Sequence, residues 1–220
     1  QGAPMKTIAI ASAKGGSCKT TCTATLAARA AMDSSRVAIL DLNQDQGNLS
    51  DWWTLRGRPK NPTLIDLEDI SEDIEALRES GCEWVFIDTP PLEVRLIEQA
   101  IAVADLVVIP VRTSFLDINA TDAVTSLCRR HRKLFAFLLA AVDVKMPKLT
   151  EQAMHMLLRM AKPGGRVMTS RMSYRQGYIQ SLAVGRAAHE TEKTLVGEID
   201  SIWAEVRQLA ESRRASEAAQ

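Results

Sequence analysis

The chain has 220 residues, of which 46% are hydrophobic and 25% are charged, as expected of a globular protein with a sizeable core. This composition excludes intrinsic disorder over most of the length, and at about 150 residues per domain it favours a single domain. The longest wholly apolar stretch, 134–142, is too short for a membrane-spanning helix of about 20 residues, and no signal peptide is recognised. We therefore expect a cytosolic protein.

The net charge is zero, with 27 basic and 27 acidic residues, but the charges are distributed unevenly along the chain. Residues 41–105 hold 15 acidic and 5 basic side chains, a net charge of −10, whereas residues 129–175 hold 11 basic and 2 acidic ones, a net charge of +9. The basic segment either presents a face to an anionic partner or consists of solvated loop and helix charges.

Apolar runs that predict buried strands alternate with segments that can form helices. The strands are expected at 6–11, 37–40, 85–87, 106–111 and 134–142, and the helices at 19–32, 93–103 and 119–132. This alternation predicts an α/β fold with a mostly parallel, twisted sheet and helices on both faces. The last part is helical, with one apolar stripe formed by Ile199, Ile202, Trp203, Val206 and Leu209.

The domain is expected to cover residues 5–212. Residues 1–4 precede the first methionine and are interpreted as a possible cloning remnant, and residues 213–220 form a polar tail. The apolar stripe of the last helix stops before Arg213, which favours packing against the domain over insertion into a membrane surface. The four cysteines lack a disulfide spacing and are expected to be reduced thiols: Cys18, Cys22, Cys82 and Cys128.

The strongest chemical signal is the loop between the first strand and the first helix, which reads Lys14-Gly15-Gly16-Ser17-Cys18-Lys19-Thr20-Thr21. A helix N-terminus offers unpaired amide groups and a partial positive charge, and glycines let the backbone close around phosphate oxygens. Lys19 can neutralise the β- and γ-phosphates, and Thr20 can bind Mg²⁺. The plainer alternative is a glycine-bearing turn between a strand and a helix.

With this loop and four further motifs, the sequence resembles the ParA/MinD family of P-loop ATPases. Lys14 matches the extra lysine of the family's deviant Walker A loop. The other motifs are Asp41-Leu42-Asn43, Phe86-Ile87-Asp88-Thr89-Pro90-Pro91, Ile109-Pro110-Val111 followed by Leu116-Asp117, and Tyr174-Arg175-Gln176-Gly177-Tyr178. The set is most similar to small plasmid-partition ParA proteins that lack an added N-terminal DNA-binding domain.

This resemblance implies ATP and Mg²⁺ as cofactors and a homodimer that sandwiches the nucleotides. Lys14 would reach across to phosphates bound by the other subunit, so that catalysis depends on dimerisation. Asp88, at the end of a strand, would hold Mg²⁺ through a water molecule. The alternative for Asp88 is a carboxylate that caps the next turn.

Two departures from the family pattern predict slow hydrolysis. Cys18 stands where the family has glycine, at a position expected to need a positive φ, and such strain costs about 1–3 kcal/mol. Asn43 stands where the family's switch loop has an aspartate that orients the attacking water, and an amide cannot act as a base. Asp45, two residues further on, could supply the carboxylate instead.

The resemblance also implies non-specific DNA binding by the ATP-bound dimer, through basic residues in the matching region: Arg166, Arg171, Arg175 and Arg186. Contacts to phosphate carry no sequence information and weaken with salt, as suits a protein that moves over a nucleoid. A ParB-like adaptor or a cargo protein would stimulate hydrolysis and release. We expect a cytoplasmic, nucleoid-associated protein without stable membrane association.

The rival hypothesis is a P-loop binding module that no longer hydrolyses ATP and acts as a nucleotide-dependent scaffold or a constitutive DNA binder. Cys18 and Asn43 favour this alternative. A metabolic kinase or synthetase would need an acceptor site, for which the sequence offers no set of residues.

Overall fold

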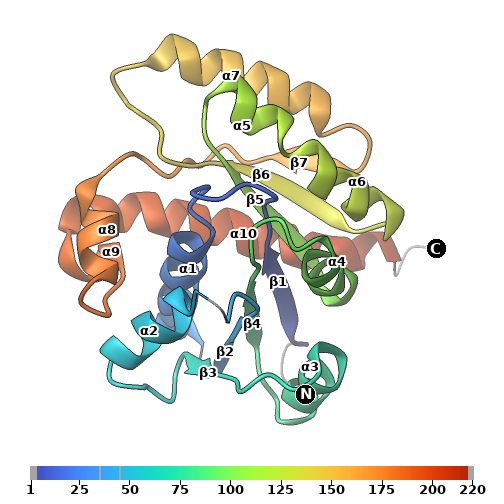
Figure 1. The fold of residues 1–220 in the computed structure, drawn as a ribbon, viewed down its shortest axis with the longest axis vertical. Coiled ribbons are helices and arrows are strands. Elements are labelled where there is room, and N and C mark those ends of the chain that lie inside the picture. The colour runs from blue at the N-terminus through green and yellow to red at the C-terminus, as the bar shows by residue number, and fades with distance from the viewer. Residues whose placement is uncertain (1–3, 35, 45, 218–220) are drawn as a thin grey trace.

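The computed structural model describes residues 4–34, 36–44 and 46–217, which form a single α/β domain around a parallel sheet (Figure 1). The seven strands of this part of the chain lie in the order β3-β2-β4-β1-β5-β6-β7. Their bounds are β1 Lys6–Ile10, β2 Val37–Asp41, β3 Thr63–Leu64, β4 Trp84–Asp88, β5 Leu106–Val111, β6 Leu134–Leu139 and β7 Gly165–Val167. Every pairing is parallel, so the predicted fold class is confirmed.

Helices cover both faces of the sheet, because both faces of each central strand are apolar. One layer is built around α1 Lys19–Asp33, α2 Asn48–Leu55, α8 Gln176–Leu182, α9 Ala188–Thr191, the short 3-10 helix Lys193–Leu195 and α10 Val196–Glu217. The other contains α3 Ile70–Glu79, α4 Val94–Val103, α5 Phe115–Asn119, α6 Asp122–Arg130 and α7 Pro147–Met160. None of the helices described combines the length and apolarity that a bilayer crossing requires.

Alternate residues of each strand enter the two cores. In β1, Ile8 and Ile10 pack in the layer of α1 and α10, whereas Ala9 packs in the layer of α4 and α6. This is the period of two expected when side chains of successive strand residues point to opposite faces. The sheet is thereby fixed on both sides, and its carboxyl edge, where the loops emerge, is rigidly placed.

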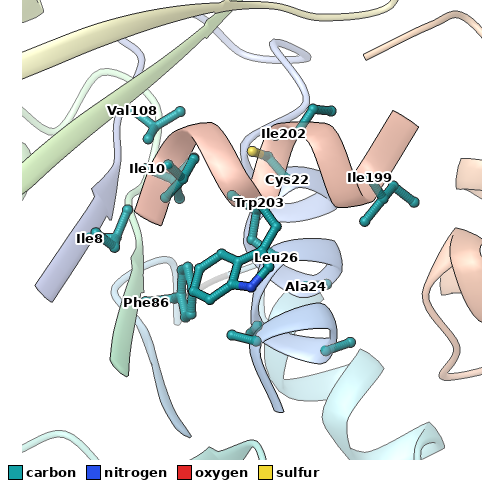
Figure 2. Packing of buried hydrophobic residues seen from close by; sticks show 14 of the residues in the cluster. Ile8, Ile10, Cys22, Ala24, Leu26, Phe86, Val108, Ile199, Ile202 and Trp203 are labelled. Carbon is teal, nitrogen blue, oxygen red and sulfur yellow. The ribbon is translucent and has the colours of Figure 1, made fainter. Parts of the chain in front are cut away.

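The C-terminal helix is docked through Trp203, as Figure 2 shows. Its indole lies edge-on to Trp84, with ring centroids 4.7 Å apart, and contacts Phe86 at 6.1 Å. The indole N–H donates to Asp33 Oδ2 at the end of α1, at 3.0 Å. Ile199, Ile202 and Val206 are buried beside it, so the predicted apolar stripe packs against the domain.

Most predicted elements are confirmed, with three differences. The predicted strand at 134–142 ends at Leu139, and Val142 makes only an isolated bridge to Ser173. The helix predicted at 119–132 is confirmed but shorter, because α6 runs from Asp122 to Arg130 and a separate helix, α5, ends at Asn119. The last helix continues to Glu217, beyond residue 212 where the polar tail was expected to begin.

The four cysteines are free thiols, and three of them are buried as small apolar groups: Cys22, Cys82 and Cys128. Cys18 is partly exposed in the loop before α1.

Trp203 should be the main attachment of α10 to the sheet. Trp203→Ala removes a buried aromatic side chain and should lower the free energy of unfolding by about 3–5 kcal/mol. Trp203→Phe, which loses mainly the hydrogen bond to Asp33, should cost about 1–2 kcal/mol. Urea denaturation measures both, with Met32→Ala on the exposed side of α1 as the control, expected to change stability by under about 0.5 kcal/mol. A Trp203→Ala cost no larger than the control's would contradict this assignment.

Candidate functional site

The candidate site is the loop that joins β1 to α1 at the carboxyl edge of the sheet (Figure 1). Gly16 and Cys18 both have a φ of 69°, so the backbone turns through the left-handed region twice before the helix begins. Cys18 is the N-cap residue of α1, and no side chain caps the first amide groups. The Ser17 hydroxyl is buried and has no hydrogen-bond partner. These unpaired donors are what a phosphate-binding loop requires.

Lys19 lies at the start of α1 with its side chain mostly buried. Its Nζ donates to the Lys14 carbonyl at 3.2 Å, which holds the ammonium over the loop. Burial lowers the pKa of Lys19, and the nearby Asp88 carboxylate opposes that shift. A desolvated ammonium inside a loop of free amide groups fits a bound polyphosphate.

Asp88 ends β4 and is only 1% exposed. Thr20 Oγ1 donates to its Oδ2 at 2.6 Å, and Thr23 Oγ1 donates to its Oδ1 at 3.2 Å. Burial raises the pKa of Asp88 to about 7, the Thr20 hydrogen bond opposes this shift, and the Asp41 charge adds to it. A buried carboxylate next to a threonine hydroxyl fits Mg²⁺, because a hard cation with oxygen ligands would stabilise the ionised form.

The switch region follows β2, whose last residue pairs in register with Asp88 of β4. Asp41 Oδ1 accepts from the Asn43 amide at 2.9 Å, and its Oδ2 accepts from the Ser50 amide and hydroxyl at 3.2 and 3.1 Å. Asn43 is buried and its Nδ2 donates to Gln46 Oε1 at 3.1 Å. Asp45, the predicted substitute carboxylate, lies outside the described residues.

Lys14 forms an ion pair with Asp117 of α5, within the same chain. The Lys14 side chain is 44% exposed and the Asp117 side chain 15%. Asp117 also accepts from Ser114 Oγ at 2.5 Å. Sequence reasoning noted the Leu116-Asp117 pair only as a family motif and gave Asp117 no contact with the loop, although a charged residue just after β5 emerges at the same edge as the loop.

Arg112 directly follows β5 and was missed by sequence reasoning altogether. Its charge acts on the Cys18 thiol, and its Nη2 lies 3.9 Å from where a Cβ on Gly16 would be. Burial raises the pKa of Cys18, whereas Arg112 opposes this shift. The predicted left-handed backbone at Cys18 is confirmed by its φ, so a side chain stands where glycine is unstrained.

The four arginines proposed for DNA are all exposed. Arg166 in β7 borders a cavity of about 490 Å³ together with Arg129, Arg132 and Lys133. Arg175 borders a separate cavity of about 600 Å³ beside α8. Arg186 follows α8, and its carbonyl accepts from the Trp52 indole N–H at 3.1 Å. Arg166 and Arg175 therefore border separate cavities, and none of the cavities of the described residues brings the four arginines together.

The parallel sheet, the loop of free amide groups and the buried carboxylate at one edge define a P-loop nucleotide-binding protein. Comparison with protein families agrees: the model of the CobQ/CobB/MinD/ParA nucleotide binding domain matches residues 8–187. This match spans most of the chain, which therefore belongs to that family. A comparison with curated proteins finds no match.

Solved structures with similar folds include apo McdA from Cyanothece, with a TM-score of 0.72 at 18% identity, covering 93% of this chain and 99% of that one. MinD from Aquifex aeolicus gives 0.69 at 19% identity, covering 89% and 94%. A putative plasmid partition protein from Borrelia burgdorferi bound to AMPPNP gives 0.69 at 16% identity, covering 93% and 99%. These likenesses establish the fold.

The raised pKa of Asp88 determines the direction in which the free energy of unfolding changes with pH. The unfolded carboxyl ionises near its usual pKa of about 4, whereas the folded protein holds the pKa at about 7. The stabilising contribution of the protonated group is therefore full below about pH 4 and lost as the pH rises through about 7. Without nucleotide, the free energy of unfolding in urea should fall between pH 5 and 8, by at most about 1.4 kcal/mol per pH unit. Asp88→Asn should lack this component, and equal slopes for both proteins would contradict the assignment.

Proposed function

We infer that this protein is an ATP-dependent positioning ATPase: it dimerises on binding ATP, holds DNA non-specifically as the dimer, and is released when a partner stimulates hydrolysis. The observation that carries the proposal is the convergence, at one edge of the sheet, of the loop with Lys14 and Lys19 and the buried Asp88 carboxylate.

The proposed roles are supported by the positions of the side chains. Bound Mg²⁺ and ATP would supply a γ-phosphoryl group for transfer to water, a reaction catalysed by positioning and charge neutralisation. The loop amides of residues 15–21 and the Lys19 ammonium would bind the phosphates, and Thr20 and Asp88, which are hydrogen-bonded to each other, would hold the metal. Lys14 neutralises charge in the other subunit, and Asn43 or Asp45 orients the attacking water.

The homodimer is supported by apolar side chains exposed around the loop. Leu92 after β4, Phe115 and Leu116 after β5, and Val144 and Met146 after β6 each have more than half of their surface exposed. They emerge from the carboxyl ends of adjacent strands, where the phosphate loop also lies. Exposed apolar groups gathered in this way are characteristic of an association surface, and a second copy of the same face would cover them.

Non-specific DNA binding is supported by the segregation of charge in the fold. The acidic segment 41–105 supplies β3, β4 and the end of β2, on one side of β1, and the basic segment 129–175 supplies β6 and β7 at the opposite edge. The acidic and basic segments of the sequence therefore lie on opposite sides of the sheet. The basic edge with Arg166 in β7, together with Arg171 and Arg175 on the segment that leads from β7 to α8, suits the phosphate backbone of DNA in the cytoplasm, on the nucleoid.

We propose that the partner is a ParB-like adaptor or a cargo protein. The printed descriptions of the similar structures include a cell division protein complex of MinC with MinD and a putative plasmid partition protein. The cargo, a plasmid or another assembly, is set by that partner.

A second candidate function is a binding module that retains nucleotide without turnover. Cys18 holds a left-handed backbone that costs about 1–2 kcal/mol for a residue other than glycine. The side-chain amide of Asn43 donates a hydrogen bond to Gln46, and it provides no carboxylate that could orient an attacking water.

DNA retention tests the proposed function. With ATP and Mg²⁺, wild type should elute from immobilised DNA at a higher salt concentration than without nucleotide. Arg171→Gln with Arg175→Gln removes two cations and should reduce the slope of log affinity against log salt by up to about 2. Arg78→Gln with Arg95→Gln, on α3 and α4, is the charge-matched control. Retention that depends on neither nucleotide nor salt would contradict the proposal.

Restoring glycine at the N-cap of α1 separates the two candidate functions. Cys18→Gly relieves backbone strain equivalent to about 1–2 kcal/mol, so an ATPase restrained by the cysteine should turn over roughly ten-fold faster. Cys18→Ala keeps a side chain in the left-handed conformation and should remain slow. Steady-state phosphate release measures this, and a rate near zero in all three proteins would favour the binding module.

A further inference from the structure

A cavity lined by four cations lies at the amino edge of the sheet, opposite the edge that carries the phosphate loop. Its volume is about 490 Å³, within the range of small-ligand sites. The amino ends of β6 and β7 form part of its wall, beside the last turn of α6 and Ser212 of α10 (Figure 1). The four cations are Arg129, Arg132, Lys133 and Arg166, and none of the described residues that line the cavity is acidic.

The lack of a carboxylate distinguishes this cavity from three others among the described residues. Glu192 lines the cavity beside α8, and Asp33 and Glu211 line both of the cavities beside α10. Cations that are brought together without a carboxylate repel one another, so an anion placed between them is stabilised. The wall of this cavity therefore favours a ligand with several negative charges.

Two of the cations are fixed by the fold. Arg129 Nη2 donates to the Met160 carbonyl at 2.6 Å, and its guanidinium lies 5.5 Å from the centroid of the Phe135 ring. Lys133 Nζ donates to the Ala104 carbonyl at 3.0 Å. Because these side chains are already ordered, binding an anion beside them costs little side-chain entropy. Their contacts with the fold do not account for the other two cations.

Arg132 and Arg166 have donors beyond those that the fold uses. Both side chains are exposed, and Arg166 Nη1 donates to the Gly165 carbonyl at 2.9 Å. Within the described part of the chain, neither arginine forms an ion pair. Since a guanidinium offers five N–H donors in a planar fork, each of the two can bind a phosphate in a bidentate manner.

The backbone at Arg132 supports a role for its side chain. Arg132 lies two residues beyond the end of α6 with a φ of 51°, and its amide donates to the Arg129 carbonyl at 3.1 Å. Glycine or asparagine is preferred in this conformation after a helix, and another residue costs stability. An arginine therefore stands where glycine would be unstrained, and it borders the cavity. Such a cost is typical of functional sites.

We propose that this cavity binds a small anion with two or more linked phosphate groups, at a site separate from the phosphate loop. Arg132 and Arg166 donate to the phosphates, and Arg129 and Lys133 supply charge from the wall. Linked phosphates also occur in DNA, but a duplex presents them along an extended surface, whereas here four cations surround one hollow. The inference goes beyond the proposed function, under which such a ligand would compete with DNA at Arg166.

Protection of arginines from phenylglyoxal, followed by peptide mass spectrometry, tests the site with inorganic tripolyphosphate as the probe. At physiological ionic strength, tripolyphosphate should slow modification of Arg132 and Arg166 by roughly five-fold or more, with one common midpoint. Exposed Arg95 of α4 is the internal reference and should be unaffected. Lys19→Ala, which impairs the phosphate loop, should show the same protection. Modification of Arg132 and Arg166 at equal rates with and without tripolyphosphate would overturn the proposal.

The contribution of each arginine is measured in the variant that lacks the other. Arg166→Gln, followed at Arg132, and Arg132→Gly, followed at Arg166, should each raise the midpoint roughly ten-fold, because charge-assisted hydrogen bonds to phosphate are lost. Arg132→Gly also relieves the left-handed backbone, so its melting temperature should equal or exceed that of wild type. Weaker binding by this variant would then not arise from unfolding.

Arg171→Gln with Arg175→Gln is the matched control. It removes two cations from the proposed DNA surface and should leave the midpoint for tripolyphosphate within about two-fold of wild type. A rise as large as in the cavity variants would show that protection reflects the general charge of the basic edge, and would overturn the site.

Duplex DNA as a second probe separates the two sources of phosphate. If duplex DNA protects Arg132 and Arg166 while tripolyphosphate at the same phosphate concentration does not, the cavity belongs to a DNA surface and the small-anion site is overturned. If tripolyphosphate protects both arginines but the protein does not retain DNA in response to nucleotide, the proposed function fails and the site stands.

Discussion

The site is organised around a buried carboxylate without a full counter-charge. Asp88 ends a strand in the middle of the sheet, almost wholly removed from water, and two threonine hydroxyls of α1 donate to it. The cation that acts on it within the described part of the chain, Lys19, is itself desolvated and directed toward the loop. Such a carboxylate is costly in the free protein. Under the proposed function, the same cost would favour binding of a divalent cation with its phosphates, because the metal would supply the missing charge.

The parallel sheet brings residues that are far apart in the sequence to the same edge. Carboxyl ends of β1, β2, β4 and β5 lie together, so residues far apart in sequence, such as Lys14 and Asp117, meet at one edge. The strand order also places the acidic and basic segments on opposite sides of β1. Under the proposed function, a dimer formed through the carboxyl edge would leave both basic edges accessible, and nucleotide and DNA would then bind to different surfaces.

The structural features that depend on a local sequence pattern were predicted correctly from the sequence. Buried strands such as 106–111 and the loop after β1 follow from apolar runs and from glycine beside Lys19, and the positive φ of Cys18 follows from the chemistry of that turn. The contacts that depend on tertiary placement were missed. The Lys14–Asp117 pair and the position of Arg112 arise from the spacing of β1 and β5, which no local pattern encodes. The short helix α5, which ends where the predicted helix was expected to begin, was also missed, because five residues are too few to show a helical period.

Cys18, Arg112 and Asp117 form a single cluster at the loop, and this bears on how the chain departs from its family's pattern. A side chain at position 18 strains the loop, and the charge of Arg112 acts on its thiol. Arg112 in turn contributes to the charge balance of Asp117, which holds Lys14. Loss of glycine at the N-cap therefore places a strained side chain beside the groups that surround Lys14. Under the proposed function, this strain weakens the hold of the loop on phosphate, and restoring glycine at position 18 would relieve it.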